Sequence, residues 1–151
     1  MTDQADLQRL IDLEAIKQLK ARYLRLMDLK RWDEWRTVFT TDCVMEVPEV
    51  NTVYRGREGI VSRVSAVLAG TRTCHHAHMP EIEFTGEGTA LGTWAMFDYV
   101  EWPKQDGVRV GFQGYGHYRE QYVRNDDEWR IARTRLERLR LDSLGAIPDL
   151  W

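Results

Sequence analysis

Three side chains suited to proton transfer stand out in this sequence: a phenol at Tyr23, a carboxylate at Asp28 and an imidazole at His75. A carboxylate that holds an imidazole in one tautomer gives a base that works near neutral pH, because free histidine titrates around pH ~6.5. A tyrosine hydroxyl can donate a hydrogen bond to an oxygen atom of a substrate. These residue types favour acid–base chemistry over a purely structural role.

Two of these residues also have an ordinary structural interpretation. Tyr23 by itself fits a helix aromatic packed on a sheet, and Asp28 fits the start of a second helix or a solvent-facing position. Positions five apart on an ideal helix are separated by about 140°. Tyr23 and Asp28 therefore share a cavity only if the helix ends or bends between them, or if the pocket wraps around the helix end.

The histidines of residues 73–79 need separate treatment. On a strand, His76 and His78 face one side and His75 faces the other. A His-X-His pair is half of a possible metal site, but the chain has only His117 besides these three, and no nearby spacing resembles a zinc or iron site. We therefore expect no metal. Each histidine alone is explained equally well as a hydrogen-bonded strand residue.

A further polar group is expected inside an apolar cavity. Trp94, Met96 and Asp98 alternate onto one face of a predicted strand, which places Asp98 deep among apolar side chains and Trp94 in the pocket wall. Both are candidate substrate-binding residues, although the tryptophans are also explained as core or interface residues. The sequence has no Gly-X-Ser-X-Gly elbow, and the glycines at 111–116 lie in a predicted strand, which excludes a phosphate-binding loop there.

Length and charge exclude several classes of protein. The 151 residues suit a single domain spanning 1–151. A net charge of −3 gives no general reason to bind nucleic acid or an anionic membrane. Residues 1–10 carry charges and no continuous apolar run, so we expect no signal peptide, no membrane span and a cytoplasmic location. Cys43 and Cys74 are then expected to be reduced.

The hydrophobic pattern predicts helices followed by strands. Apolar residues at steps of three and four from Leu7 to Met27 predict one long helix that ends at 27–29. A shorter helix is expected at 32–39, with residues 40–42 as the loop that leaves it, and another at 56–68. A small pair of strands is expected at 43–47 and 52–54. Four long strands follow at 73–84, 89–102, 108–124 and 129–141, separated by turn sequences. This order predicts an α+β domain whose helices cover one face of a curved sheet. Its outer face is expected to be covered by self-association.

Several segments match a known family in residue type and spacing: Leu13–Tyr23, Asp28, Trp32–Glu34, Cys74–Ile82, Gly92–Trp94 and Asp126–Trp129. In these segments the chain resembles the SnoaL-like proteins of the nuclear transport factor 2-like superfamily, bile acid 7α-dehydratase most of all and scytalone dehydratase and hexachlorocyclohexane dehydrochlorinase more distantly. The resemblance implies a cone-shaped α+β barrel, in which about three N-terminal helices cap a strongly curved, mostly antiparallel sheet. It also implies a homo-oligomer, with a trimer favoured and a dimer as the alternative.

The same resemblance assigns roles to individual residues. Tyr23, Asp28 and His75 match the family's catalytic tyrosine, aspartate and histidine, and Arg138 falls where the bile acid enzyme has a functionally implicated arginine. The chain departs from scytalone dehydratase at Val100, in place of a second catalytic histidine, and at Tyr118, in place of a pocket asparagine. A scytalone-like substrate is thereby disfavoured.

Together these features predict a cofactor-independent lyase that eliminates water from a hydroxylated, carbonyl-activated ring compound, steroid-like or polycyclic. The partner is then a small hydrophobic substrate. The same residues could instead serve a ketosteroid-type isomerase or a polyketide cyclase, since the superfamily contains both. A non-catalytic domain that binds hydrophobic ligands is the third alternative.

Overall fold

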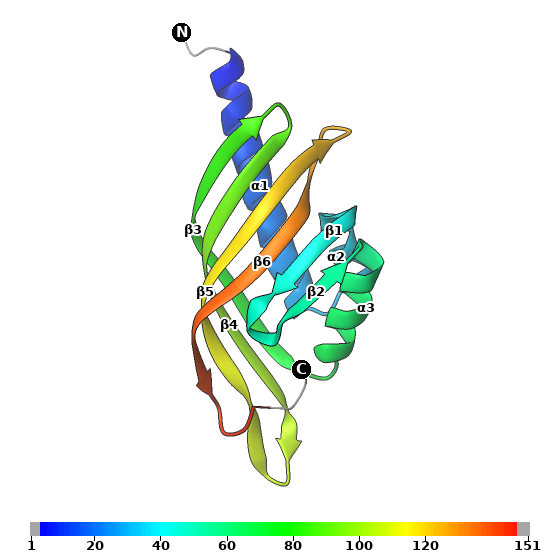
Figure 1. The fold of residues 1–151 in the computed structure, drawn as a ribbon, viewed down its shortest axis with the longest axis vertical. Helices are drawn as coiled ribbons and strands as arrows, with labels where there is room; N and C mark the ends of the chain where they lie inside the picture. The colour runs from blue at the N-terminus through cyan, green and yellow to red at the C-terminus, as the bar shows by residue number, and fades with distance from the viewer. Residues whose placement is uncertain (1–3, 148–151) are drawn as a thin grey trace.

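The long first helix, α1 (Gln4–Asp28), turns one apolar stripe toward the sheet. Its buried residues are Ile16, Leu19, Lys20, Tyr23, Leu26 and Met27. The apolar residues of its first turns, among them Leu7 and Leu10, are instead more than half exposed. They are exposed because the start of α1 extends beyond the neighbouring strands (Figure 1). This computed structural model describes residues 4–147. None of the helices in that range has the length and apolar character needed to cross a membrane.

A tight turn ends α1 directly after Asp28. Lys30 adopts a left-handed conformation with φ 57°. Its backbone N–H donates to the carbonyl of Met27 at 3.1 Å, and the N–H of Arg31 donates to the carbonyl of Leu26 at 2.9 Å. These two bonds satisfy the last carbonyls of the helix and reverse the chain. Asp28 therefore projects from the very end of α1 toward the sheet.

The segment after this turn differs from its sequence-based prediction. A helix at 32–39 was expected, but α2 (Trp32–Trp35) is one turn long and continues as the 3-10 helix η1 (Arg36–Val38). Residues 40–42, expected as an exit loop, belong to strand β1 (Phe39–Val47). The strand begins early because Phe39, fully buried, pairs with Ile131 of a distant strand.

A mixed sheet of six strands forms the second layer (Figure 1). After β1 the chain forms the 3-10 helix η2 (Pro48–Val50), β2 (Thr52–Arg55) and α3 (Arg57–Val67). Four long strands follow: β3 (Arg72–Gly86), β4 (Thr89–Gln105), β5 (Val108–Asn125) and β6 (Glu128–Ser143). The strand order is β2-β1-β6-β5-β4-β3. Among the five strand pairings of this sheet in residues 4–147, that of β1 with β6 is parallel and the other four are antiparallel. The predicted α+β class with a curved, mostly antiparallel sheet is confirmed; the sheet is open between β2 and β3.

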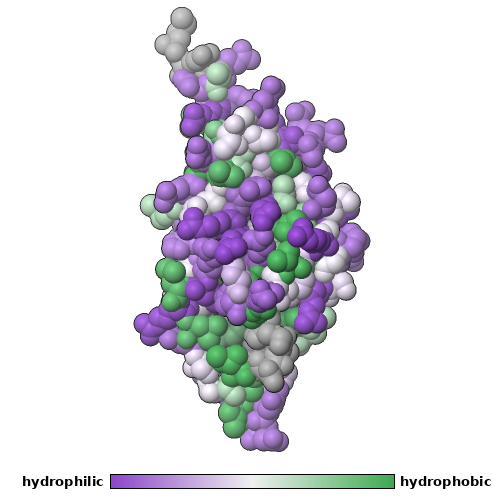
Figure 2. All heavy atoms as spheres, viewed as in Figure 1, coloured by the Kyte–Doolittle hydropathy of each residue, from purple (hydrophilic) through white to green (hydrophobic). Residues whose placement is uncertain are grey.

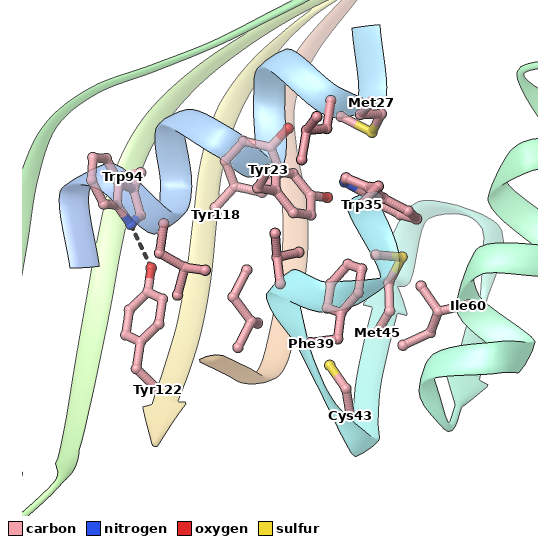
Figure 3. Close-up of a cluster of buried hydrophobic side chains, with 14 of the residues drawn as sticks. Tyr23, Met27, Trp35, Phe39, Cys43, Met45, Ile60, Trp94, Tyr118 and Tyr122 are labelled. Atoms are coloured by element: carbon pink, nitrogen blue, oxygen red, sulfur yellow. Dashed lines mark hydrogen bonds between the residues drawn. The ribbon is translucent and has the colours of Figure 1, made fainter. Parts of the chain in front are cut away.

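Aromatic side chains fill the space between α1 and the sheet (Figure 3). The ring of Tyr23 lies 5.4 Å from that of Trp35 and 5.8 Å from that of Phe39, measured between centroids. Tyr118 of β5 contacts Tyr23 edge-to-face at 6.1 Å. The core therefore packs directly against the side chain that the sequence singles out for chemistry.

The outer face of the sheet is largely hydrophilic in its middle (Figure 2). Ion pairs link Arg119 of β5 to Glu137 of β6 and Arg135 of β6 to Glu46 of β1, and Glu137 also pairs with Arg135 within β6. Exposed apolar side chains on β5 and β6 include Tyr115, Leu139 and Leu141. The apolar outer face on which self-association was predicted is therefore only partly present, and a dimer or trimer stays a prediction.

Candidate active site

A cavity lies between α1, α3 and the inner face of the sheet. Its volume is about 100 Å³. Apolar side chains make most of its wall, including Met45, Val64, Val67, Leu68, Val100, Trp102, Phe112 and Leu136. The polar side chains that reach it include Tyr23, His75, Asp98, Tyr118 and Arg138. An apolar pocket with a few convergent polar groups is the usual form of a small-molecule site.

Asp28 and His75 meet at the rim of this cavity. His75 Nδ1 lies 2.6 Å from Asp28 Oδ1, and the backbone N–H of His75 donates to Asp28 Oδ2 at 2.9 Å. The hydroxyl of Thr73 donates to Asp28 Oδ1 at 2.8 Å. Asp28 is the last residue of α1, so its side chain reaches β3 from the end of the helix. The angle between positions 23 and 28 on an ideal helix did not by itself decide whether this contact could form.

The two ends of the His75 ring have different surroundings. Nδ1 is occupied by Asp28, whereas within residues 4–147 no hydrogen bond reaches Nε2. Partial burial alone would raise the pKa of Asp28, but the hydrogen bonds and charge of His75, with the hydroxyl of Thr73, lower it below its usual value. Asp28 is thus ionised at neutral pH and holds a proton on Nδ1, which leaves the Nε2 lone pair available as a base.

Tyr23 and Tyr118 present two hydroxyl groups to the cavity. Their rings are nearly fully buried and meet edge-to-face (Figure 3). In the described part of the chain, neither hydroxyl has a hydrogen-bond partner among the protein groups. Burial is the main cause that raises the pKa of both phenols well above the usual value of 10.0. Both groups therefore stay protonated and act as donors.

An ion pair forms part of the cavity wall. Arg138 Nη2 lies 2.5 Å from Asp98 Oδ2, and its Nη1 donates to Glu49 Oε1 at 2.6 Å. Asp98 is fully buried, as its place on the strand predicted. Burial by itself lowers the pKa of Arg138, but the attraction of Asp98 and the hydrogen bonds to Asp98 and Glu49 raise it overall. The guanidinium is permanently charged and rigidly placed.

Trp94 lies in the hydrophobic core and does not line the cavity. Its side chain faces inward, as the alternation along the strand predicted, but it is not among the residues that line the cavity. Its indole N–H donates to the hydroxyl of Tyr122 at 2.8 Å, the dashed line in Figure 3. We therefore assign Trp94 to the core and leave it out of the proposed site.

The remaining histidines of β3 lie on the outer face. The rings of His76 and His78 are 5.6 Å apart, and Cys74 Sγ lies 3.3 Å from His76 Nε2. No group of three or more metal-ligating side chains is found in residues 4–147.

Two site features were not assigned a role from the sequence. Tyr118 was noted only as a departure from a relative, yet its hydroxyl is a second donor beside Tyr23. Gly114 pairs with Asp98 in the sheet and leaves room for the Asp98–Arg138 ion pair. The alternating Gly114 and Gly116 in a strand are a usable signal, because strand glycines often mark a close approach by another group.

Comparison with known proteins agrees with this fold. The family model of the SnoaL-like domain matches residues 8–135. The chain therefore belongs to the SnoaL-like family of the nuclear transport factor 2-like superfamily.

Solved structures extend the likeness over nearly the whole chain. A protein from Novosphingobium aromaticivorans described as a scytalone dehydratase is 23% identical, with a TM-score of 0.81 over 93% of this chain and 95% of that one. A type 2 hexachlorocyclohexane dehydrochlorinase (LinA) is 19% identical, with a TM-score of 0.80 over 93% of each chain. A Mycobacterium tuberculosis protein of unknown function is 27% identical, with a TM-score of 0.75 over 91% of this chain and 77% of that one. The similarities to the N. aromaticivorans protein and to LinA, both below 25% identity, show a shared fold.

Proposed function

We propose that this protein is a cofactor-independent dehydratase that removes water from a cyclic hydroxyketone. The observation that carries the proposal is a base and two donors around one cavity. His75 Nε2 is free while Asp28 holds the opposite nitrogen, and the hydroxyls of Tyr23 and Tyr118 have no protein partner within residues 4–147. A base and an oxyanion site are the parts needed to remove a proton next to a carbonyl.

The elimination proceeds in two steps. His75 Nε2 takes the proton from the carbon next to the carbonyl, and the electrons of that C–H bond form an enolate whose oxygen accepts hydrogen bonds from Tyr23 and Tyr118. The enolate then re-forms the carbonyl, the new carbon–carbon double bond forms, and the C–O bond to the hydroxyl breaks. The imidazolium returns its proton to this hydroxyl, which leaves as water.

Known magnitudes make these roles sufficient for substantial catalysis. A positioned general base contributes typically ~10² to 10⁴-fold. An oxyanion donor contributes about 10² to 10³-fold. Asp28 keeps His75 in the required tautomer, and Arg138, fixed by Asp98, supplies a charged group in the cavity wall that orients the substrate.

The size of the cavity bears on the substrate. Its volume of about 100 Å³ is below the roughly 300–1,000 Å³ of pockets that hold drug-sized ligands. We therefore favour compounds of one or two rings over the steroid-like or larger polycyclic compounds expected from the resemblance. The structural likeness to proteins described as a dehydratase and a dehydrochlorinase supports elimination chemistry by analogy.

The test is turnover of 3-hydroxycyclohexanone, followed by the ultraviolet absorbance of cyclohexenone and by the loss of water in mass spectrometry. We expect wild-type turnover, a near-complete loss in His75→Ala and a loss of about 10² to 10³-fold in Tyr23→Phe. A conjugated product of unchanged mass from an unsaturated ketone, without dehydration, would show an isomerase instead. Tight binding of cyclic ketones with neither dehydration nor exchange of the proton for deuterium would show a ligand-binding domain.

A further inference from the structure

A lysine is buried beneath the two cavity tyrosines. Lys20 lies on the inner face of α1 and is fully buried. Its Nζ atom lies 3.4 Å from the ring centroid of Tyr118 and 4.2 Å from that of Tyr23. The ammonium thus contacts the π-faces of both phenols whose hydroxyls reach the cavity.

A rigid network holds this ammonium in place. Lys20 Nζ donates to Glu120 Oε1 at 2.6 Å, and Thr134 Oγ1 donates to the same oxygen at 2.9 Å. The hydroxyl of Tyr122 donates to Glu120 Oε2 and accepts a hydrogen bond from Trp94. Burial lowers the pKa of Lys20, whereas the charge of Glu120 and its hydrogen bond to Nζ act in the opposite direction and favour the ammonium. A carboxylate that accepts hydrogen bonds from three side chains is a fixed counter-charge for this ammonium. Lys20 therefore cannot move away from the rings without breaking the network.

Stability alone does not explain this arrangement. Replacing a buried ion pair by apolar side chains of similar volume is often neutral or stabilising, because desolvation of the two charges offsets their attraction. Such a replacement would have to remove Glu120 as well, because a lone buried carboxylate is costly. The charge requires a reason connected with its neighbours.

The neighbours supply that reason. A cation over an aromatic face attracts π-electron density. In a phenol this withdraws density from the oxygen, polarises the O–H bond and makes the hydroxyl a stronger donor. Burial and the charge of Glu120 raise the pKa of Tyr23, so they act in the opposite direction. The ammonium is the cation that contacts both rings, and it acts on both donors at once.

We propose that Lys20 is a positioning residue that strengthens hydrogen-bond donation from Tyr23 and Tyr118 to an oxygen in the cavity. This inference rests on the proposed function, because it assumes that a carbonyl or enolate oxygen is held by these hydroxyls. Lys20 itself does not touch the substrate.

The experiment measures donor strength without turnover. The probe is 1-indanone with a carbon-13 label at its carbonyl, whose stretching band in isotope-edited infrared spectra moves to lower wavenumber as hydrogen bonding strengthens. The variants are Lys20→Gln, which keeps a donor for Glu120, and Lys20→Met combined with Glu120→Gln, which removes both charges in case the first variant does not fold. Tyr23→Phe and Tyr118→Phe serve as references. Ile131→Ala, a core truncation outside the cavity, is the control for lost stability.

We expect both Lys20 variants to move the bound carbonyl band back toward higher wavenumber, in the direction of the two Tyr→Phe references, while Ile131→Ala keeps the wild-type band. In the dehydration assay kcat should fall about tenfold with little change in KM, because only the part of the cation–π interaction that strengthens as the enolate forms lowers the barrier. A folded Lys20 variant with the wild-type band, in the presence of shifted bands for Tyr23→Phe or Tyr118→Phe, would overturn the role of Lys20 and leave the proposed function standing. If neither tyrosine variant moves the band, both proposals are overturned.

Discussion

A Cβ atom placed on Gly114 would lie 2.1 Å from Oδ1 of Asp98 and 2.7 Å from Cδ of Arg138. Gly114 and Asp98 are direct partners in the β4–β5 ladder. The ion pair between Asp98 and Arg138 therefore occupies the space that any larger residue at 114 would need. This part of the cavity wall has its present form because strand position 114 carries no side chain.

Gly114→Ala should displace the ion pair and destabilise the protein. Overpacking of a filled interior costs typically about 1–3 kcal/mol, and the shifted Arg138 should also weaken ketone binding. Urea unfolding and titration with 1-indanone measure the two effects. Gly59→Ala is the matched control: no atom lies within 4 Å of its added Cβ, and it lies in α3, so it should stabilise by about 0.5–1 kcal/mol. If Gly114→Ala and Gly59→Ala had the same unfolding free energy and the same affinity for 1-indanone, Gly114 would not have the proposed steric role.

Arg138→Met should be strongly destabilising. It leaves Asp98 fully buried without its partner, a change that costs about 3–5 kcal/mol in buried pairs. Combining it with Asp98→Asn removes the uncompensated charge, so the double variant should be more stable than Arg138→Met alone. Thermal and urea unfolding of the three variants check the order. If Arg138→Met alone were as stable as the wild type, the ion pair between Asp98 and Arg138 would contribute nothing to folding stability.

His75→Ala and Asp28→Asn should affect turnover as one unit. Both should lower kcat, because the first removes the base and the second replaces the carboxylate, 2.6 Å from Nδ1, by a neutral amide that neither fixes the imidazole tautomer nor raises its basicity. The double variant should be scarcely slower than His75→Ala, since coupled catalytic groups are non-additive. The dehydration assay gives the three rates. Independent, multiplying losses would mean that Asp28 does not act through His75.

The stabilising contact of Asp28 should depend on pH in one direction. Its pKa is lower in the folded protein than the usual value near 3.8, so its contribution is fully present above the unfolded pKa and is lost as pH falls through the folded one. The difference in unfolding free energy between wild type and Asp28→Asn should thus be larger at about pH 5 than at about pH 3, and should shrink as the pH falls through the folded pKa. Urea titrations at these pH values measure it. A difference that grows on acidification would contradict the lowered pKa.

The helices and long strands could be predicted because their apolar residues recur at the period of each element. The prediction was wrong at residues 36–42: a helix followed by an exit loop was predicted there, but the structure has a 3-10 helix and the start of β1. The reason is tertiary: Phe39 is drawn into a strand by its pairing with Ile131. Local sequence carries no sign of a partner that far away.

The candidate site was predictable to a similar extent. The alternation of Trp94, Met96 and Asp98 identified the inward face of β4, but it could not show how far along the strand the cavity extends, so Trp94 was included. Lys20 was missed because lysine ordinarily faces solvent. Its burial depends on Glu120, which is 100 residues away in the sequence.

The parallel pairing of β1 with β6 has a consequence for the order of folding. It joins segments far apart in the chain, as the ion pair of Glu46 with Arg135 across 89 residues illustrates. Closing so long a loop is entropically costly and slows folding. During synthesis α1 and the β1–β2 hairpin emerge well before β6, the strand that joins that hairpin to the rest of the sheet and carries Arg138. We therefore expect a nascent chain arrested before residue 128 to be unable to complete the cavity, and ketone binding to arise only as the last strand docks.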